Sequence, residues 1–116
     1  MRRIRMPTEN ELPRGPARDF VELLFGLLNA AHRPTLRQIS EAIRDRGDRQ
    51  GTASHETIRR MLHGSIPGQW LTVEAVMVAL CDLAGMDPDE RRHSEEWGDY
   101  TWRERIESSW LRALDA

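Results

Sequence analysis

The segment spanning residues 35–67 constrains the fold most, because it divides into two short amphipathic pieces separated by a polar, glycine-containing turn. Thr35 and Gln38 have the spacing of a capping box, in which each side chain bonds the backbone N–H of the other residue. Ser54 is a good cap for a second helix, and Gly64 supplies its stop. This segment therefore predicts two consecutive helices joined by a turn.

The second of these helices, expected over residues 54–63, has two chemically different faces. Ile58, Met61 and Leu62 recur at helical spacing and are expected to point inward. The opposite face is polar and charged, with Glu56, Arg59, Arg60 and His63 at its centre and His55 and Thr57 at its flanks. Such a helix packs by one face and leaves the other for solvent or for a charged partner.

Apolar stripes between proline and glycine breaks continue through the rest of the chain. A first helix is expected from Pro16 to the break at Pro34, and a fourth helix from a cap at Thr72 to Gly85. No alternation of apolar and polar residues bounded by turns indicates a strand. The sequence therefore predicts an all-α domain of five or six helices.

The C-terminal part is expected to add helices to this domain. Asp87, Pro88 and Glu90 resemble a helix start, so a charged helix is predicted up to Trp97. Thr101 and Glu104 repeat the capping-box spacing before a last helix. That helix carries apolar residues at intervals of four, namely Trp102, Ile106, Trp110 and Leu114.

Charge divides the chain unevenly. Residues 1–81 hold 12 Arg and 9 acidic residues, whereas residues 82–116 hold 5 Arg and 10 acidic residues. This asymmetry favours contact of the first part with a polyanion, although an ordinary solvated surface remains the alternative. We expect a flexible basic arm over residues 1–14, a helical domain over residues 15–86, and an acidic, tryptophan-containing C-terminal helical extension over residues 87–116.

Composition excludes several classes of protein and site. The single cysteine, Cys81, rules out an internal disulfide framework and lies in an apolar run typical of a core. No apolar run has the length of a membrane span, and the N-terminus lacks the apolar segment of a signal peptide. We expect a soluble protein of the cytoplasm with no contact to a membrane.

Histidines offer no convincing catalytic or metal site. His55 and His63 lie eight residues apart with Arg59 between them, which is a poor spacing for a pair of metal ligands. No acid–histidine–nucleophile set stands out. We therefore expect no enzyme, no catalytic residues, no metal and no cofactor.

The arrangement of residues 35–67 and the helix that follows resembles the Cro/C1/XRE family of phage and bacterial repressors. The shared features are an apolar first helix, a glycine-bearing turn, a capped second helix closed by glycine, and a proline-containing loop. They are carried by Leu36, Ile39, Ser40, Ile43, Gly47, Ser54, His55, Glu56, Thr57, Ile58, Gly64, Pro67 and residues 73–83. The resemblance covers about residues 18–90, and the tryptophans of residues 97–110 are similar to those of small actinobacterial helix-turn-helix proteins.

This resemblance implies a lambda-repressor-like helix-turn-helix in a sequence-specific transcriptional regulator, a repressor that binds double-stranded DNA at the nucleoid. The second helix of such a motif lies in the major groove. The positions that correspond to the family's base-reading residues are His55, Glu56 and Arg60. Those that would contact the DNA backbone are Thr35, Arg37, Arg49, Thr57, Arg59, His63 and Ser65. The turn at residues 47–53 is about five residues longer than in the family, a length that can shift the angle between the two helices or place Arg49 against a phosphate.

The C-terminal extension leaves two further interpretations open. Family members commonly dimerise, and the candidate dimer interface is formed by Trp97, Trp102, Ile106 and Trp110, although the same stripe equally fits an intramolecular core. The acidic surface of residues 87–99 could contact a protein partner. The alternative function is therefore a helical protein–protein adaptor, or an antitoxin-like module that binds its partner through the same fold.

Overall fold

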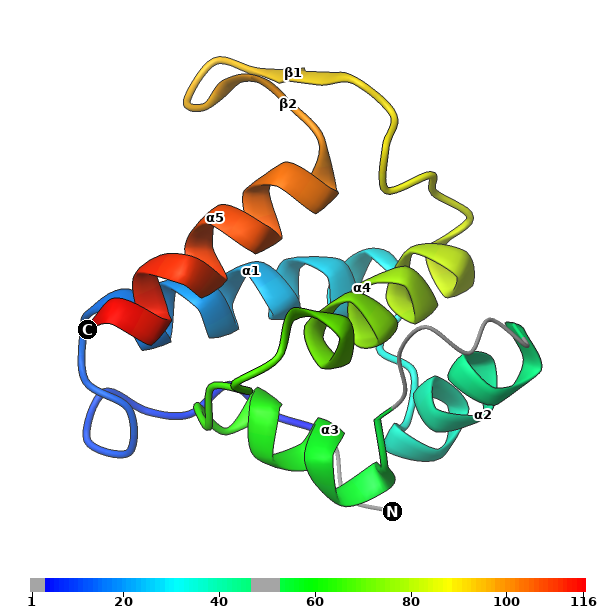
Figure 1. Cartoon of the computed structure of the whole chain (residues 1–116), viewed down its shortest axis with the longest axis horizontal. Helices are drawn as coiled ribbons and strands as arrows, with labels where there is room; N and C mark the ends of the chain where they lie inside the picture. Colours follow the sequence, from blue (N-terminus) through cyan, green and yellow to red (C-terminus); the bar gives the residue numbers. More distant parts are fainter. Residues whose placement is uncertain (1–3, 47–52) are drawn as a thin grey trace.

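The computed structural model describes residues 4–46 and 53–116, which form a mostly helical body with one small hairpin (Figure 1). The radius of gyration is 13.4 Å. In chain order the helices are α1 (Pro16–Ala30), α2 (Leu36–Arg46), α3 (His55–Leu62), α4 (Trp70–Ala84) and α5 (Trp102–Asp115), and the strands are β1 (Arg92–Ser94) and β2 (Gly98–Tyr100).

Several predicted helix ends are confirmed by hydrogen bonds. The Thr35 N–H donates to Oε1 of Gln38 at 2.8 Å, and the Gln38 N–H donates to Oγ1 of Thr35 at 3.1 Å, which completes the capping box of α2. At the start of α5, Oγ1 of Thr101 accepts from the Glu104 N–H at 3.1 Å. Pro16 occupies the first turn of α1, where a backbone N–H has no partner within the helix, so proline costs no hydrogen bond there.

The start of α4 differs from the prediction. The helix begins at Trp70, two residues before the expected cap at Thr72, and no side chain caps it at Gln69. The earlier start carries the Trp70 ring toward α5, where it lies 5.6 Å from the ring of Trp110. At the other end Gly85 adopts a left-handed conformation with φ 71°, as expected for the residue that stops a helix.

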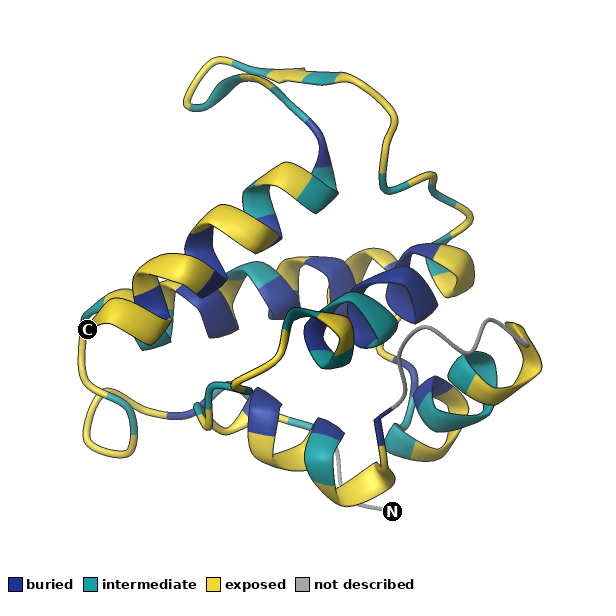
Figure 2. Cartoon of the chain, in the orientation of Figure 1, coloured by how far each residue is buried: buried dark blue, intermediate teal, exposed yellow. Residues whose placement is uncertain are grey.

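The core lies where α1, α4 and α5 face one another, and α2 and α3 close it from the other side (Figures 1 and 2). Phe20, Leu24 and Leu28 of α1 are completely buried, as the spacing of the apolar residues predicted. Helix α1 contacts α3, α4 and α5, so it forms the centre of the domain. Because α5 packs against α1, the C-terminal residues are part of the same body.

Residues 87–100 contradict the prediction of a charged helix and of a chain without strands. Oδ1 of Asp87 accepts from the Asp89 N–H at 2.9 Å, which makes a turn in place of a helix start. Strands β1 and β2 then pair in antiparallel fashion, with Arg92 opposite Tyr100 and Ser94 opposite Gly98. Gly98 has φ 71°, a conformation that glycine adopts readily and that suits the short connection between the strands.

Residues 4–14 lie against the body, an arrangement that differs from the loose arm expected there. Ile4, Met6 and Leu12 pack against the core, and Nη1 of Arg18 donates to the carbonyl oxygens of Pro7 and Leu12 at 3.1 and 2.8 Å. These contacts use apolar residues whose spacing is too irregular to show in the sequence. Residues 1–3 lie outside the described part of the chain.

Gly64, which follows α3, lies in close contact with Leu12 of this N-terminal segment. Gly64 has φ 108°, and a Cβ atom placed there would lie 2.9 Å from Cδ1 of Leu12. Only glycine fits both the backbone conformation and the close approach. Within residues 4–46 and 53–116, no helix has the length and hydropathy needed to cross a membrane.

Candidate nucleic-acid interface

Helix α3 presents a polar surface because its few apolar residues all point into the body. Ile58, Met61 and Leu62 are at most 2% exposed, and their contacts fix the helix against the core. Ser54 caps the helix with its Oγ, which accepts from the Thr57 N–H at 3.1 Å. Glycine and proline follow its end, so the polar face is confined to two turns of helix.

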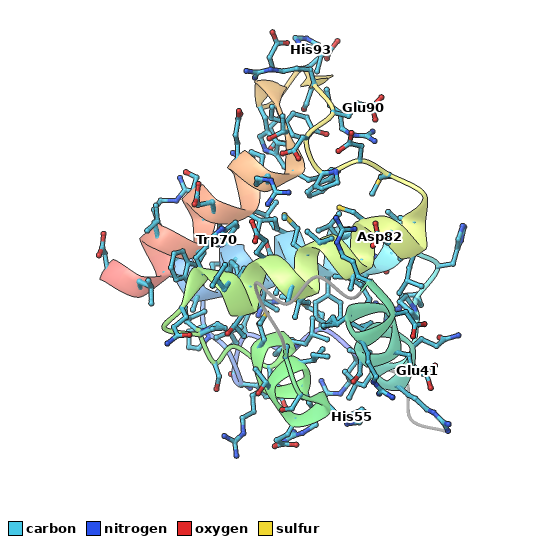
Figure 3. The ribbon with its side chains drawn as sticks, turned by 45° about the vertical axis from the view of Figure 1, so that its right-hand side comes forward. Glu41, His55, Trp70, Asp82, Glu90 and His93 are labelled. Carbon is cyan, nitrogen blue, oxygen red and sulfur yellow. The ribbon has the colours of Figure 1, made fainter. Side chains whose placement is uncertain are left out.

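The three predicted base-reading residues, His55, Glu56 and Arg60, are all exposed on this surface. His55 lies at the opposite end of the molecule from His93 and Glu90, which belong to the hairpin and the loop before it (Figure 3). The acidic residues of the hairpin are therefore well separated from α3. No labelled residue of the hairpin or the loop before it lies beside His55 (Figure 3).

Glu56 holds both arginines of α3 in one cluster. Its Oε1 lies 2.6 Å from Nη2 of Arg59 and 3.2 Å from Nε of Arg60, and its Oε2 accepts from Nε of Arg59 at 3.0 Å. The spacing of three and four residues brings the side chains together on one face of the helix. The sequence contains this signal, but the mutual pairing was not predicted from it.

The cluster changes the electrostatics of the surface. The hydrogen bond from Arg59, followed by the positive charges of Arg59 and Arg60, lowers the pKa of Glu56 to about 2. The same hydrogen bond raises the pKa of Arg59 above its ordinary value. Glu56 is therefore ionised at neutral pH, and the three side chains together carry a single net positive charge.

The predicted backbone-contacting residues divide into free and occupied groups. The Thr35 hydroxyl accepts the capping hydrogen bond from the Gln38 N–H at the start of α2. The Thr57 hydroxyl lies 2.9 Å from Oγ of Ser54, the residue that caps α3. Nε of Arg37 donates to Oε1 of Glu41 at 3.0 Å on the surface of α2. His63 and Ser65 are exposed beyond the end of α3. Arg49 lies outside the described residues.

The candidate dimer interface requires a correction, because two of its four side chains are inside the domain. Ile106 is fully buried, and Trp110 is 7% exposed with its Nε1 donating to the Pro67 carbonyl at 2.8 Å. Trp97 and Trp102 are half-buried and form an edge-to-face cluster with Tyr100. The tryptophan stripe is therefore mainly an intramolecular packing element, as the alternative interpretation held.

Cys81 and His93 are other described side chains that could be reactive, and each is engaged elsewhere in the fold. Burial and the neighbouring charge of Asp82 raise the pKa of Cys81 to about 11, so its thiol is protonated at neutral pH. His93 pairs with Asp99 at 2.8 Å on the exposed hairpin. Among the described residues no three His, Cys, Asp or Glu side chains lie close enough to hold a metal ion together.

Comparison with known proteins adds no further assignment. No protein-family model matches the sequence, and the searches of curated proteins and of solved structures find no match either.

Proposed function

We propose that this protein is a sequence-specific DNA-binding transcriptional regulator that places α3 in the major groove. The observation that carries the proposal is the division of α3 into a buried apolar face and an exposed face that holds His55, Glu56, Arg59 and Arg60. A helix anchored in this way is a rigid support for side chains that approach base edges. The preceding helix, α2, contacts α3 and supports it from the side.

The exposed residues of α3 suit different parts of a DNA contact. Arg60 can donate two hydrogen bonds to O6 and N7 of guanine, and Glu56 can accept from N4 of cytosine. Arg59 and His63 lie on the same exposed face and suit phosphate oxygens. To bind DNA, Arg59 and Arg60 must break their ion pairs with Glu56 and contact DNA instead. Exposed ion pairs of this kind are weak enough to open.

The proposed regulator acts in the cytoplasm at the nucleoid, as a repressor that occupies its site. A homodimer would place two copies of α3 on neighbouring half-sites and raise the affinity. Ile106 and Trp110 cannot contribute to such a dimer without leaving the core. A C-terminal contact would have to use the outer side of α5, where Leu111 and Leu114 are 50% and 41% exposed.

The second candidate function is that of a protein-binding adaptor or antitoxin-like module. The Glu56 cluster favours it, because the acid cancels one of the two arginine charges that would attract DNA. The net charge of the chain is −2, which also gives no general attraction to a polyanion. An adaptor would bind its partner through the acidic tail or through α3 without any preference for DNA sequence.

A selection of bound duplexes from a genomic fragment library tests the proposal. Purified protein is expected to enrich fragments that share a short sequence, and Arg60→Ala is expected to reduce this enrichment. Arg91→Ala is the matched control, because Arg91 is an exposed arginine that directly precedes β1 and does not belong to α3. Recovery of fragments without a common sequence would favour the adaptor.

A further inference from the structure

A cleft of about 330 Å³ lies between α1, α5 and the turn of the hairpin. Its described lining residues come from these three elements, and it is within the size range of sites that bind small molecules. The polar groups of the cleft are distributed unequally. Arginines line the α5 side, and carboxylates line the side of α1 and the hairpin.

Two buried polar atoms in the wall of the cleft lack a hydrogen-bond partner among the described residues. They are Nε of Arg105 and Oγ of Ser109, and Ser109 is only 1% exposed. Buried polar groups in folded proteins are nearly always hydrogen-bonded, so both atoms call for a partner. Because an arginine N–H can only donate, the missing partner must carry an acceptor.

The positions of the cations also favour an anionic partner. Ser109 follows Arg105 by four residues and precedes Arg112 by three, so the three side chains lie along one face of α5. The guanidinium of Arg105 lies 4.2 Å from the centre of the Trp97 ring, which holds it in place. Among the described residues, neither Arg105 nor Arg112 forms an ion pair with a carboxylate.

The carboxylates of the cleft have less need of a partner. Glu22 pairs with Nε of Arg18 at 3.3 Å. Asp19 and Glu96 are exposed and can be hydrated. Among the described residues, no buried carboxylate oxygen lacks a hydrogen-bond partner, but Nε of Arg105 does. The unmet requirement of the cleft is therefore for an acceptor and not for a cation.

An apolar wall completes the site. Gly26 lies in the middle of α1, where glycine weakens the helix, and a Cβ atom there would lie 3.7 Å from the Trp102 ring. Leu23 lies beside it on the same side of α1 and also lines the cleft. That contact is with Cη2 at the edge of the Trp102 ring, and no other described neighbour lies within 4 Å of the Cβ position, so open space remains over Gly26 that suits a flat ring.

We propose that this cleft binds a small aromatic carboxylate. The carboxylate accepts hydrogen bonds from Arg105, Ser109 and Arg112, while the ring lies against Trp102 above Gly26. The proposal does not rest on DNA binding, since its described lining residues belong to α1, α5 and the hairpin turn and not to α3.

Benzoate is the probe that tests this site, with benzylamine as the cationic counterpart of the same shape. The four tryptophan indole N–H signals of the ¹⁵N-labelled protein are followed by NMR and assigned with Trp→Phe variants. Benzoate is expected to shift the signals of Trp97 and Trp102, with a dissociation constant of about 1 mM for so small a ligand. Trp70 and Trp110 line no part of the cleft and should keep their signals.

Two variants test the assigned roles. Arg112→Gln is expected to weaken benzoate binding roughly tenfold, the effect of losing one charge-assisted hydrogen bond. Gly26→Leu is expected to abolish binding by filling the space beside Trp102, and it replaces an exposed helical glycine with a better helix former. Arg44→Gln, on the exposed surface of α2, is the matched control and should bind benzoate like the original protein.

Other outcomes overturn the proposal. Absence of any shift up to about 10 mM benzoate means that the cleft is no carboxylate site. Stronger binding of benzylamine than of benzoate assigns the cleft to the carboxylates of α1 and the hairpin. Unchanged affinity in either Arg112→Gln or Gly26→Leu, or equal shifts at Trp70 and Trp110, places the ligand elsewhere.

Discussion

Glu56 and Arg59 are joined by two hydrogen bonds across one turn of α3, the shorter of them 2.6 Å between Oε1 and Nη2. Arg60 shares the same carboxylate at 3.2 Å. The three side chains are exposed, so this cluster is a property of the surface that the proposed function assigns to DNA. Any DNA contact by the arginines competes with Glu56.

Glu56→Gln should strengthen binding to duplexes of arbitrary sequence, because it releases two arginines and removes a negative charge from the surface. The dependence of log affinity on log salt should become steeper by up to about one unit. Anisotropy titrations at several salt concentrations measure both effects. Glu107→Gln removes an equal charge from the exposed surface of α5 and should change neither quantity. Equal effects of the two variants would mean that only net charge matters.

Alanine at Arg60 and alanine at Arg59 should have different consequences. Arg60→Ala is expected to lose about 1–3 kcal/mol of discrimination at one base pair, since a two-bond contact to guanine disappears. Arg59→Ala is expected to weaken binding to every duplex alike and to lower the salt slope by about one. Binding to a panel of single-base variants separates the two patterns. The same pattern from both variants would contradict the assigned roles.

The Glu56 carboxyl should titrate far below an ordinary glutamate. Its pKa of about 2 means that the folded state favours the ionised form. The resulting contribution to folding is present above the ordinary glutamate pKa and is lost as the pH falls through about 2. A ¹³C NMR titration of the carboxyl measures this. Arg59→Gln should return the pKa toward its ordinary value, whereas Arg91→Gln should not; a normal pKa in the unaltered protein would show that the cluster does not persist.

Trp110 should stabilise the monomer and not an interface. Trp110→Phe keeps a ring beside Trp70 but loses the bond to the Pro67 carbonyl, for a loss of about 1 kcal/mol in the free energy of unfolding. Trp110→Ala should lose about 3–5 kcal/mol because it also leaves a cavity. Denaturant unfolding at several protein concentrations measures both, and Leu83→Ala, at an exposed position of α4 away from the outer side of α5, is the control. A loss that grows with protein concentration would indicate a dimer through Trp110.

Most of the helical architecture could be predicted from local sequence, because caps and apolar spacing act within a few residues. The capping box at Thr35 and the cap at Ser54 are where the sequence placed them. The predicted cap at Thr72 would leave Trp70 outside α4, but Trp70 is the first residue of the helix. The Trp70 ring packs against Trp110, which lies forty positions further along the chain. Such long-range contacts leave no local signal.

The hairpin could not be predicted, because its residues carry the signals of a helix. Asp87, Pro88 and Glu90 are suitable for a helix start, and charged residues without a glycine follow them up to Trp97. In the structure Arg103 of α5 donates hydrogen bonds to Asp89 in the loop and to Glu74 of α4. These bonds link the loop to α4, and the residues that follow form β1 and β2. The exposed residues of α3 were predicted correctly, but which of them pair with one another was not.

The dependence of binding on salt, measured with the duplex recovered by selection and with a scrambled duplex of the same composition, tests the proposed function most directly. Tight binding to the selected duplex alone, with affinity falling steeply as salt rises, is the result expected of α3 in the major groove. Weak binding to both duplexes with little dependence on salt would contradict it, and the exposed face of α3 would then belong to a protein contact.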